Sequence, residues 1–223
     1  MKKKRILVYG DSNSWGWTPQ KEIIPTERYD LDKTWPYVMA EKLGGGFDIV
    51  VDALNGRTTC IDDPEAVISG VGLNGEAYLP AALGSHFPLD LVIIMLGVND
   101  TKEPYHRSPL DIALGILSLA SIVQSSTGVL TIYPPANVFI IAPPPLGTIA
   151  SVDWLQELFS ENSVRKSREV AGVLEPLAKG AGFAFFDAGS VISTSGSDGV
   201  HFTEENHHTI GLAIAKQVSK YFG

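Results

Sequence analysis

The sequence predicts an α/β fold in which a five-stranded parallel sheet lies between two layers of helices. Five short runs rich in Val, Ile, Leu or Phe recur along the chain, separated by longer stretches of helical character. These runs are almost continuously apolar, which is typical of strands that helices cover on both faces. With 223 residues, 44% of them hydrophobic and 19% charged, the chain is expected to form one domain, 1–223, with an ample core.

The expected strands and helices alternate along the chain, as a parallel sheet requires. The strands are predicted at residues 5–9, 47–51, 89–96, 137–142 and 183–186. Helices are predicted at residues 35–43, 109–124 and 153–179. The last of these is expected to break or kink near Pro176, because proline removes a hydrogen bond from a helix interior. Segment 61–80 is rich in Gly and has no clear period, so it is interpreted as a functional lid or an oligomer contact.

The clearest helix is the last one in the chain. Thr203 is suited to cap its start, and the two glutamates that follow match the positive end of the helix dipole. An apolar residue then recurs at every fourth position, at Ile210, Ile214, Val218 and Phe222. This stripe is expected to pack on the sheet.

Charge and composition exclude several classes of partner. Lys and Arg total 17 against 25 Asp and Glu, a net charge of −8, so neither nucleic acid nor an anionic membrane is an expected partner. The apolar stretch 6–9 is too short for a secretory signal, and segment 110–123 is shorter than the roughly 20 residues of a spanning helix. A cytoplasmic protein is therefore expected. Cys60, the one cysteine, allows neither an internal disulfide nor a thiolate metal cluster.

Polar residues follow four of the five expected strands. Residues 10–13 (Gly-Asp-Ser-Asn) follow the first strand, residues 55–57 (Asn-Gly-Arg) the second, and residues 97–100 (Gly-Val-Asn-Asp) the third. The loop after the fifth strand contains Asp198 and His201. Because the carboxyl ends of parallel strands share one edge of the sheet, where ligands bind in such folds, these loops are expected to converge.

The converging residues are of the types that acyl transfer needs. The hydroxyl of Ser12 is a weak nucleophile and needs a base, a role that suits His201. Asp198, three residues earlier, can accept from one imidazole nitrogen and leave the other free to take the proton of Ser12. The backbone N–H groups of Ser12 and Gly56 and the side-chain amide of Asn99 are the candidate donors to an oxyanion.

The blocks at residues 10–12, 56, 97–100 and 198–201 resemble those of the SGNH (GDSL-like) hydrolases, and the resemblance runs along the whole chain. It implies a flavodoxin-like three-layer sandwich, a serine esterase acting on short-chain acetyl or aryl esters through an acyl-serine, and no cofactor or metal. Ser12, Asp198 and His201 match the triad of that family. Ser12, Gly56 and Asn99 match its oxyanion donors.

Further segments, among them Arg57-Thr58-Thr59 and residues 186–190, resemble a bacterial arylesterase/acyltransferase subgroup. That resemblance implies acyl transfer from the ester substrate to alcohols as well as water, perhydrolysis with peroxide, and a homo-oligomer. Trp17 and Val200 are the candidate substrate contacts, although Trp17 is also suited to simple packing. A carbohydrate acetyl esterase is the alternative within the same chemistry.

Several polar residues near the motifs receive structural interpretations. Asn13 stands where the family has Leu, and it is expected either to change how the loop after Ser12 is held or to add a polar group at the entrance. Asp11 is expected to make a hydrogen bond within its loop. Lys102 and Arg107 are interpreted as solvated charges, with a place at the entrance of the site as the alternative. His207 and His208 are interpreted as surface or interface residues, because adjacent side chains diverge on a helix and form no metal site.

Two rival functions come from other classes of protein. Residues 70–75 read G-x-G-x-x-G, the fingerprint of dinucleotide binding, but they do not follow the first strand as that fingerprint requires. The other rival is a non-catalytic nucleotide- or ligand-binding module on a flavodoxin-like scaffold, because a fold alone does not determine function.

Overall fold

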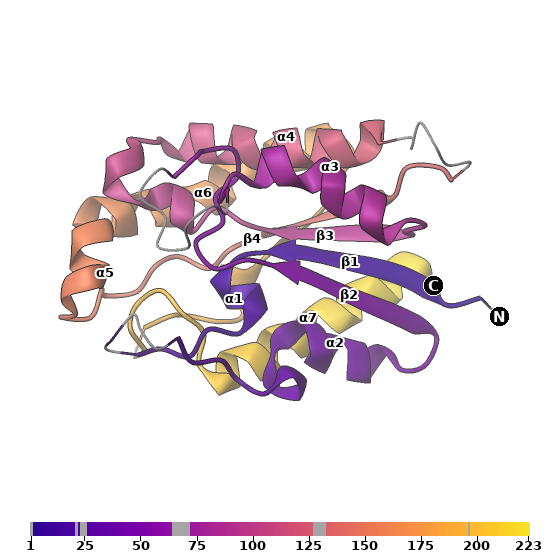
Figure 1. Cartoon of the computed structure of the whole chain (residues 1–223), viewed down its shortest axis with the longest axis horizontal. Coiled ribbons are helices and arrows are strands. Elements are labelled where there is room, and N and C mark those ends of the chain that lie inside the picture. The colour runs from indigo at the N-terminus through magenta and orange to yellow at the C-terminus, as the bar shows by residue number, and fades with distance from the viewer. Residues whose placement is uncertain (1, 21, 23–25, 64–71, 127–132, 196) are drawn as a thin grey trace.

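A computed structural model describes residues 2–20, 22, 26–63, 72–126, 133–195 and 197–223 (Figure 1). Its centre is one sheet of five parallel strands in the order β2-β1-β3-β4-β5. The strands are β1 (Lys4–Gly10), β2 (Phe47–Ala53), β3 (Leu91–Met95), β4 (Asn137–Ala142) and β5 (Ala184–Asp187). The predicted fold class is confirmed, and all five expected strands are present.

Helices cover both faces of this sheet (Figure 1). On one face lie α3 (Gly75–His86), α4 (Pro109–Ser125) and α6 (Glu161–Gly180). On the other face lie α2 (Trp35–Leu43) and α7 (Glu204–Phe222). Two short helices, α1 (Ser12–Trp15) and α5 (Asp153–Leu158), lie at the end of the sheet where the strands finish.

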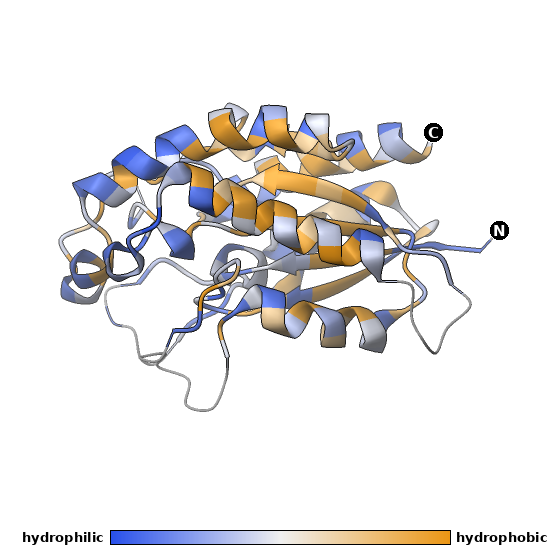
Figure 2. Ribbon diagram, turned by 90° about the horizontal axis from the view of Figure 1, so that it is seen from above, coloured by the Kyte–Doolittle hydropathy of each residue, from blue (hydrophilic) through white to orange (hydrophobic). Residues whose placement is uncertain are grey.

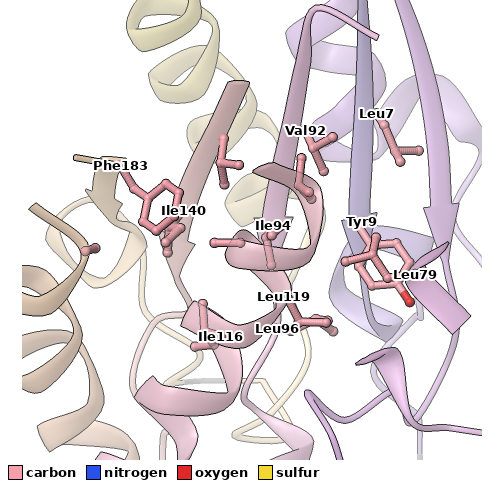
Figure 3. Close-up of a cluster of buried hydrophobic side chains, with 14 of the residues drawn as sticks. Leu7, Tyr9, Leu79, Val92, Ile94, Leu96, Ile116, Leu119, Ile140 and Phe183 are labelled. Carbon is pink, nitrogen blue, oxygen red and sulfur yellow. The ribbon is translucent and has the colours of Figure 1, made fainter. Parts of the chain in front are cut away.

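The continuous apolar runs supply two cores at once, because alternate side chains of a strand point to opposite faces. In β1, Leu7 and Tyr9 belong to the core under α3, α4 and α6, whereas Ile6 and Val8 belong to the core under α2 and α7. Figure 3 shows part of the first core, to which Tyr9 of β1 and Leu79 of α3 both contribute. In Figure 2 the strands are largely hydrophobic, and the helices carry hydrophilic residues between their apolar ones.

The helix predicted at 153–179 is two helices, so the expected break near Pro176 was placed wrongly. The chain turns between Leu158 and Glu161, where the Ser160 hydroxyl caps α6 by accepting from two backbone N–H groups, those of Asn162 and Ser163. Pro176 lies inside α6. The Ser160 cap defines the start of α6, whereas the helix continues through Pro176.

Segment 61–80 contains the start of a helix that its composition did not indicate. Asn74 caps α3 by accepting from the Ala77 N–H at 3.2 Å, and Leu79 and Leu83 are buried against the sheet. Burial of these side chains outweighs the low helix propensity of the proline and glycines in this stretch. Residues 64–71 of the segment lie outside the described residues.

The last helix follows its prediction closely. The Thr203 hydroxyl accepts from the Asn206 N–H at 3.2 Å, and the stripe of Ile210, Ile214 and Val218 is fully buried. Among the helices of the described residues, none combines the length and the apolar character needed to cross a membrane.

Candidate active site

The four polar loops lie at one end of the molecule because all five strands run in the same direction. Ser12 is the first residue of α1, directly after β1. Gly56 follows β2, and Asn99 begins a short 3-10 turn after β3. Asp198 and His201 lie in the loop that precedes α7.

The Asp198 carboxylate makes three hydrogen bonds in this loop, two with His201 and one with Val200. Oδ1 of Asp198 accepts from the backbone N–H groups of Val200 and His201 at 2.9 and 2.7 Å. Oδ2 of Asp198 lies 2.7 Å from Nδ1 of His201. Burial would raise the pKa of Asp198, but the bonds from His201 and the backbone outweigh it, so the pKa is below its ordinary value. The carboxylate is therefore charged, assigns the proton to Nδ1, and leaves Nε2 of His201 as an acceptor.

Ser12 lies in a turn that its neighbour Asp11 builds. Oδ1 of Asp11 caps α1 by accepting from the Asn13 N–H at 2.9 Å, so the expected local role of Asp11 is confirmed. Its complete burial raises the pKa of Asp11 to about 7. Ser12 occupies the first position of the helical turn, where a backbone N–H has no partner within the helix. Its N–H is therefore available to another acceptor.

Gly56 and Asn99 each present a donor near this turn. Gly56 has φ +80°, and a Cβ there would lie 3.0 Å from Leu73, so the position favours glycine for its conformation. Its N–H bonds to no other residue of the described chain. Nδ2 of Asn99 donates one hydrogen to the Arg57 carbonyl oxygen at 3.1 Å. The amide has a second hydrogen left to offer.

Arg57 holds the ends of β1 and β2 together beneath these donors. Its guanidinium donates to the carbonyl oxygens of Gly10 and Asp52 at 3.1 and 2.8 Å and to the Asp52 carboxylate at 2.8 Å. It also lies over the Tyr9 ring, 4.2 Å from its centre. A second connection joins the loops after β2 and β3, because the buried Asp100 carboxylate accepts from the Thr59 N–H and hydroxyl. Nothing in the sequence pattern had singled out Arg57 for this role.

Aromatic rings surround the imidazole. Trp17 stacks on His201, with ring centres 5.3 Å apart and an angle of 19° between the planes. Trp154 of α5 lies 6.4 Å from His201 and 6.1 Å from Trp17. Sequence reasoning missed Trp154, because only the path of the chain after β4 brings it to this edge. Val200, the other candidate contact, packs in a small apolar cluster with neighbours that include Leu155.

Two of the structural interpretations are corrected. His207 is fully buried, and its Nδ1 accepts from the Trp35 N–H at 3.2 Å. This burial lowers the pKa of His207 to about 3, so the ring is neutral. Lys102 is buried as well, and this burial lowers its pKa although nearby carboxylates oppose the shift. The sequence did not reveal that His207 and Lys102 are buried, because neighbouring elements of the fold cover both side chains.

The G-x-G-x-x-G segment lacks the context of a dinucleotide fingerprint. Its first two residues, 70 and 71, lie outside the described residues. Gly75 does begin a helix, α3, but β2 ends at Ala53 and the chain between them is a loop. The fingerprint requires a strand that leads directly into the glycine turn.

The comparisons with known proteins agree with this geometry. The profile of the GDSL-like lipase/acylhydrolase family matches residues 8–208. An aryl esterase from M. smegmatis is 49% identical, with 97% of this chain and 99% of that one covered and a TM-score of 0.91. Est24, a carbohydrate acetylesterase from Sinorhizobium meliloti, is 44% identical, with 98% and 100% covered and a TM-score of 0.92. No match was found among curated protein sequences.

Fold, loops and relatives together define the class: this is a carboxylic ester hydrolase with the SGNH arrangement. More narrowly, the chain belongs to the GDSL-like lipase/acylhydrolase family. The family resemblance predicted from the sequence motifs is thereby confirmed. A putative lipolytic protein of the G-D-S-L family from Desulfitobacterium hafniense, 14% identical with a TM-score of 0.62, shares the fold alone.

Proposed function

We propose that this protein is a serine esterase for short-chain acyl esters, with Ser12 as nucleophile, His201 as general base and Asp198 as the group that orients the base. The observation that carries the proposal is the Asp198–His201 pair. Its carboxylate is held by two backbone N–H groups and its second oxygen lies 2.7 Å from Nδ1 of His201. That arrangement leaves one imidazole nitrogen to receive a proton, which is what a serine nucleophile needs.

The proposed reaction proceeds through an acyl-serine. Oγ of Ser12 attacks the ester carbonyl carbon while Nε2 of His201 takes its proton. The negative oxygen of the tetrahedral intermediate receives hydrogen bonds from the N–H groups of Ser12 and Gly56 and from Nδ2 of Asn99. Collapse of the intermediate breaks the ester bond, and His201 returns the proton to the departing alkoxide. Water then attacks the acyl-serine by the same route and releases the acid.

Acetyl esters of phenols or sugars are the proposed substrate class. The ring centres of Trp17 and Trp154 lie 6.1 Å apart beside His201, and flat apolar side chains of this kind bind aromatic rings and the apolar faces of sugars. Relatives with 49% and 44% identity are an aryl esterase and a carbohydrate acetylesterase. Val200 is retained as a second proposed contact. An alcohol or peroxide that reaches the acyl-serine before water would receive the acyl group.

Hydrolysis of p-nitrophenyl acetate tests the proposal, with p-nitrophenyl octanoate in parallel. We expect Ser12→Ala and His201→Ala each to lose several orders of magnitude in kcat, and acetate to be cleaved faster than octanoate. Ser14→Ala is a matched control, because Ser14 is buried two residues further on and its hydroxyl has no partner in the described chain. Full activity of Ser12→Ala would refute the assignment and favour a ligand-binding module.

Self-association and location belong to the same proposal. The α4 helix exposes Leu110 and Leu114, each 50% accessible, one turn apart on one face, and a second copy of the chain would cover them. We propose a homo-oligomer, and light scattering that gives a mass near 24.0 kDa at every concentration would contradict it.

A cytoplasmic location is proposed because the apolar stretch at residues 6–9 is too short for a secretory signal. Cell fractionation tests it.

A further inference from the structure

The residue after the nucleophile contacts the backbone on both sides of the general base. Nδ2 of Asn13 donates to the carbonyl oxygen of Val200 at 3.2 Å. Oδ1 of Asn13 accepts from the backbone N–H of Phe202 at 3.0 Å. His201 is the residue between these two. A single amide thus joins the turn that carries Ser12 to the loop that carries His201, across nearly the whole length of the chain.

This contact is buried on both sides. The side chain of Asn13 is 1% exposed, and the residues that it joins are buried as well. The backbone N–H of Asn13 is itself held by Asp11 at 2.9 Å. Each polar atom of Asn13 named here therefore has a partner in the protein, and the connection between the two loops is direct.

We propose that Asn13 is a positioning residue that sets the distance and orientation between Ser12 and His201. The proposal rests on the proposed function, because it gives Asn13 a role only if Ser12 and His201 react together. Proton transfer between them requires a hydrogen-bond distance, and a displacement of about 1 Å in such geometry can cost about a hundredfold in rate. Residues 200 and 202 flank His201, so hydrogen bonds to them affect the position of the imidazole more directly than hydrogen bonds elsewhere in the loop.

The site offers one hydrogen-bond acceptor and one donor to the side chain at position 13, and asparagine matches both. A leucine, which the family has at this place, offers no donor and no acceptor. An ionised aspartate accepts from Phe202 but puts a negative oxygen against the Val200 carbonyl. The amide is the side chain that donates and accepts at the same time. A protonated carboxyl group does the same, which provides a test.

The test compares Asn13→Asp and Asn13→Leu with wild type on p-nitrophenyl acetate. We expect kcat to fall at least tenfold in both at neutral pH, with KM changed less than about threefold. The ratio of the Asn13→Asp rate to the wild-type rate should rise toward acid pH, as the introduced carboxyl gains a proton and becomes able to donate to Val200. The titratable side chains nearest to this contact, Asp11, Asp198 and His201, are present in both proteins, so the ratio removes their common effect.

The matched control is Asn206→Leu. Nδ2 of Asn206 also donates to a distant backbone carbonyl, that of Ser193, at 2.8 Å, which is not a neighbour of His201 in the chain. We expect it to keep wild-type kcat. The rate at which a fluorophosphonate labels Ser12 is the second readout, and circular dichroism confirms that each variant is folded. If Asn13→Leu does not fold, Asn13→Asp decides the question alone.

The outcomes separate this inference from the proposed function. Inactive Ser12→Ala together with wild-type kcat and labelling rate in folded Asn13 variants would overturn the positioning role and leave the esterase intact. A ratio for Asn13→Asp that does not change with pH would also overturn it. Full activity of Ser12→Ala would instead remove the proposed function, and this inference with it.

Discussion

At the scale of single residues, the two oxygens of Asp198 have different partners and therefore different functions. Oδ1 faces two backbone N–H groups, and Oδ2 faces Nδ1 of His201. The direction of a backbone N–H group is fixed by the chain, so Oδ1 holds the loop in place. The second oxygen is the one that selects the imidazole tautomer.

The variant Asp198→Asn tests this division. Its amide oxygen is expected to keep the place opposite the backbone N–H groups, so its NH₂ faces Nδ1 and forces the proton of His201 onto Nε2. We expect a loss of kcat of roughly ten-thousand-fold, with KM little changed. Steady-state hydrolysis of p-nitrophenyl acetate measures this. The exposed control Asp32→Asn removes the same charge and should be fully active, and an active Asp198→Asn would exclude the orienting role.

At the scale of structural elements, the loop before α7 depends on a backbone conformation that only glycine adopts easily. Gly199 has φ +89°, and a Cβ there would lie 2.4 Å from the Thr148 carbonyl oxygen. The same loop pairs with the segment after β4, because the carbonyls of Gly199 and Asp198 accept from the N–H groups of Gly147 and Ala150 at 2.8 and 3.0 Å. The close approach of the two segments supports the Asp198–His201 pair.

We therefore expect Gly199→Ala to separate these segments and to lower both stability and activity. The steric conflict is with backbone, which cannot rotate away, so a loss of about 1–3 kcal/mol in unfolding free energy is expected. Urea unfolding and esterase rates measure the two effects. Gly172→Ala is the control, because α6 leaves open space there and alanine favours a helix. Equal behaviour of the two variants would argue against the proposed strain.

Elements were predictable where one local signal dominated. The strands and α7 carried continuous apolar runs or a stripe with a cap, and the structure has them. The start of α3 and the break before α6 were missed, because the first depends on burial of Leu79 and Leu83 and the second on capping by Ser160. In the sequence alone, the helix-breaking character of the nearby Gly and Pro residues outweighs both of these signals. The tertiary contacts show which of them decides the structure.

At the scale of the whole molecule, two buried groups give opposite pH dependences to stability. The pKa of His207 falls from 6.5 to about 3 on burial, so below pH 6.5 the unfolded chain binds a proton that the folded chain refuses. The pKa of Asp11 rises from 3.8 to about 7, so between these values the folded chain holds a proton that the unfolded chain releases. From pH 3.8 to 6.5 the two effects oppose each other.

Removing either group should change the pH dependence of the unfolding free energy relative to wild type, a comparison in which the other titratable groups, among them Asp100 with its raised pKa, are common to both proteins. In His207→Asn, whose amide oxygen can still accept from Trp35, we expect the unfolding free energy to fall as pH rises from 4 to 6.5. In Asp11→Asn, we expect it to fall as pH drops over the same range. Each slope is at most about 1.4 kcal/mol per pH unit relative to wild type, the value for one proton. Urea unfolding at a series of pH values measures them, and slopes of the same sign would contradict this account.

The sequence by itself determined the fold class, the chemical types at the candidate site and the family. Strand patterns and short motifs are local, so a linear reading detects them. The candidate residues Ser12, Gly56, Asn99, Asp198 and His201 were therefore identifiable from the loops that follow the strands.

Only the tertiary structure decided how these parts are held. The hydrogen bonds of Asn13 to residues 200 and 202, the guanidinium bonds of Arg57 and the position of Trp154 beside His201 join segments far apart in sequence. The burial of His207 and Lys102 arises in the same way. Such contacts depend on the relative placement of several elements, which no local pattern of residues encodes, because each element's position is set by its packing against all the others.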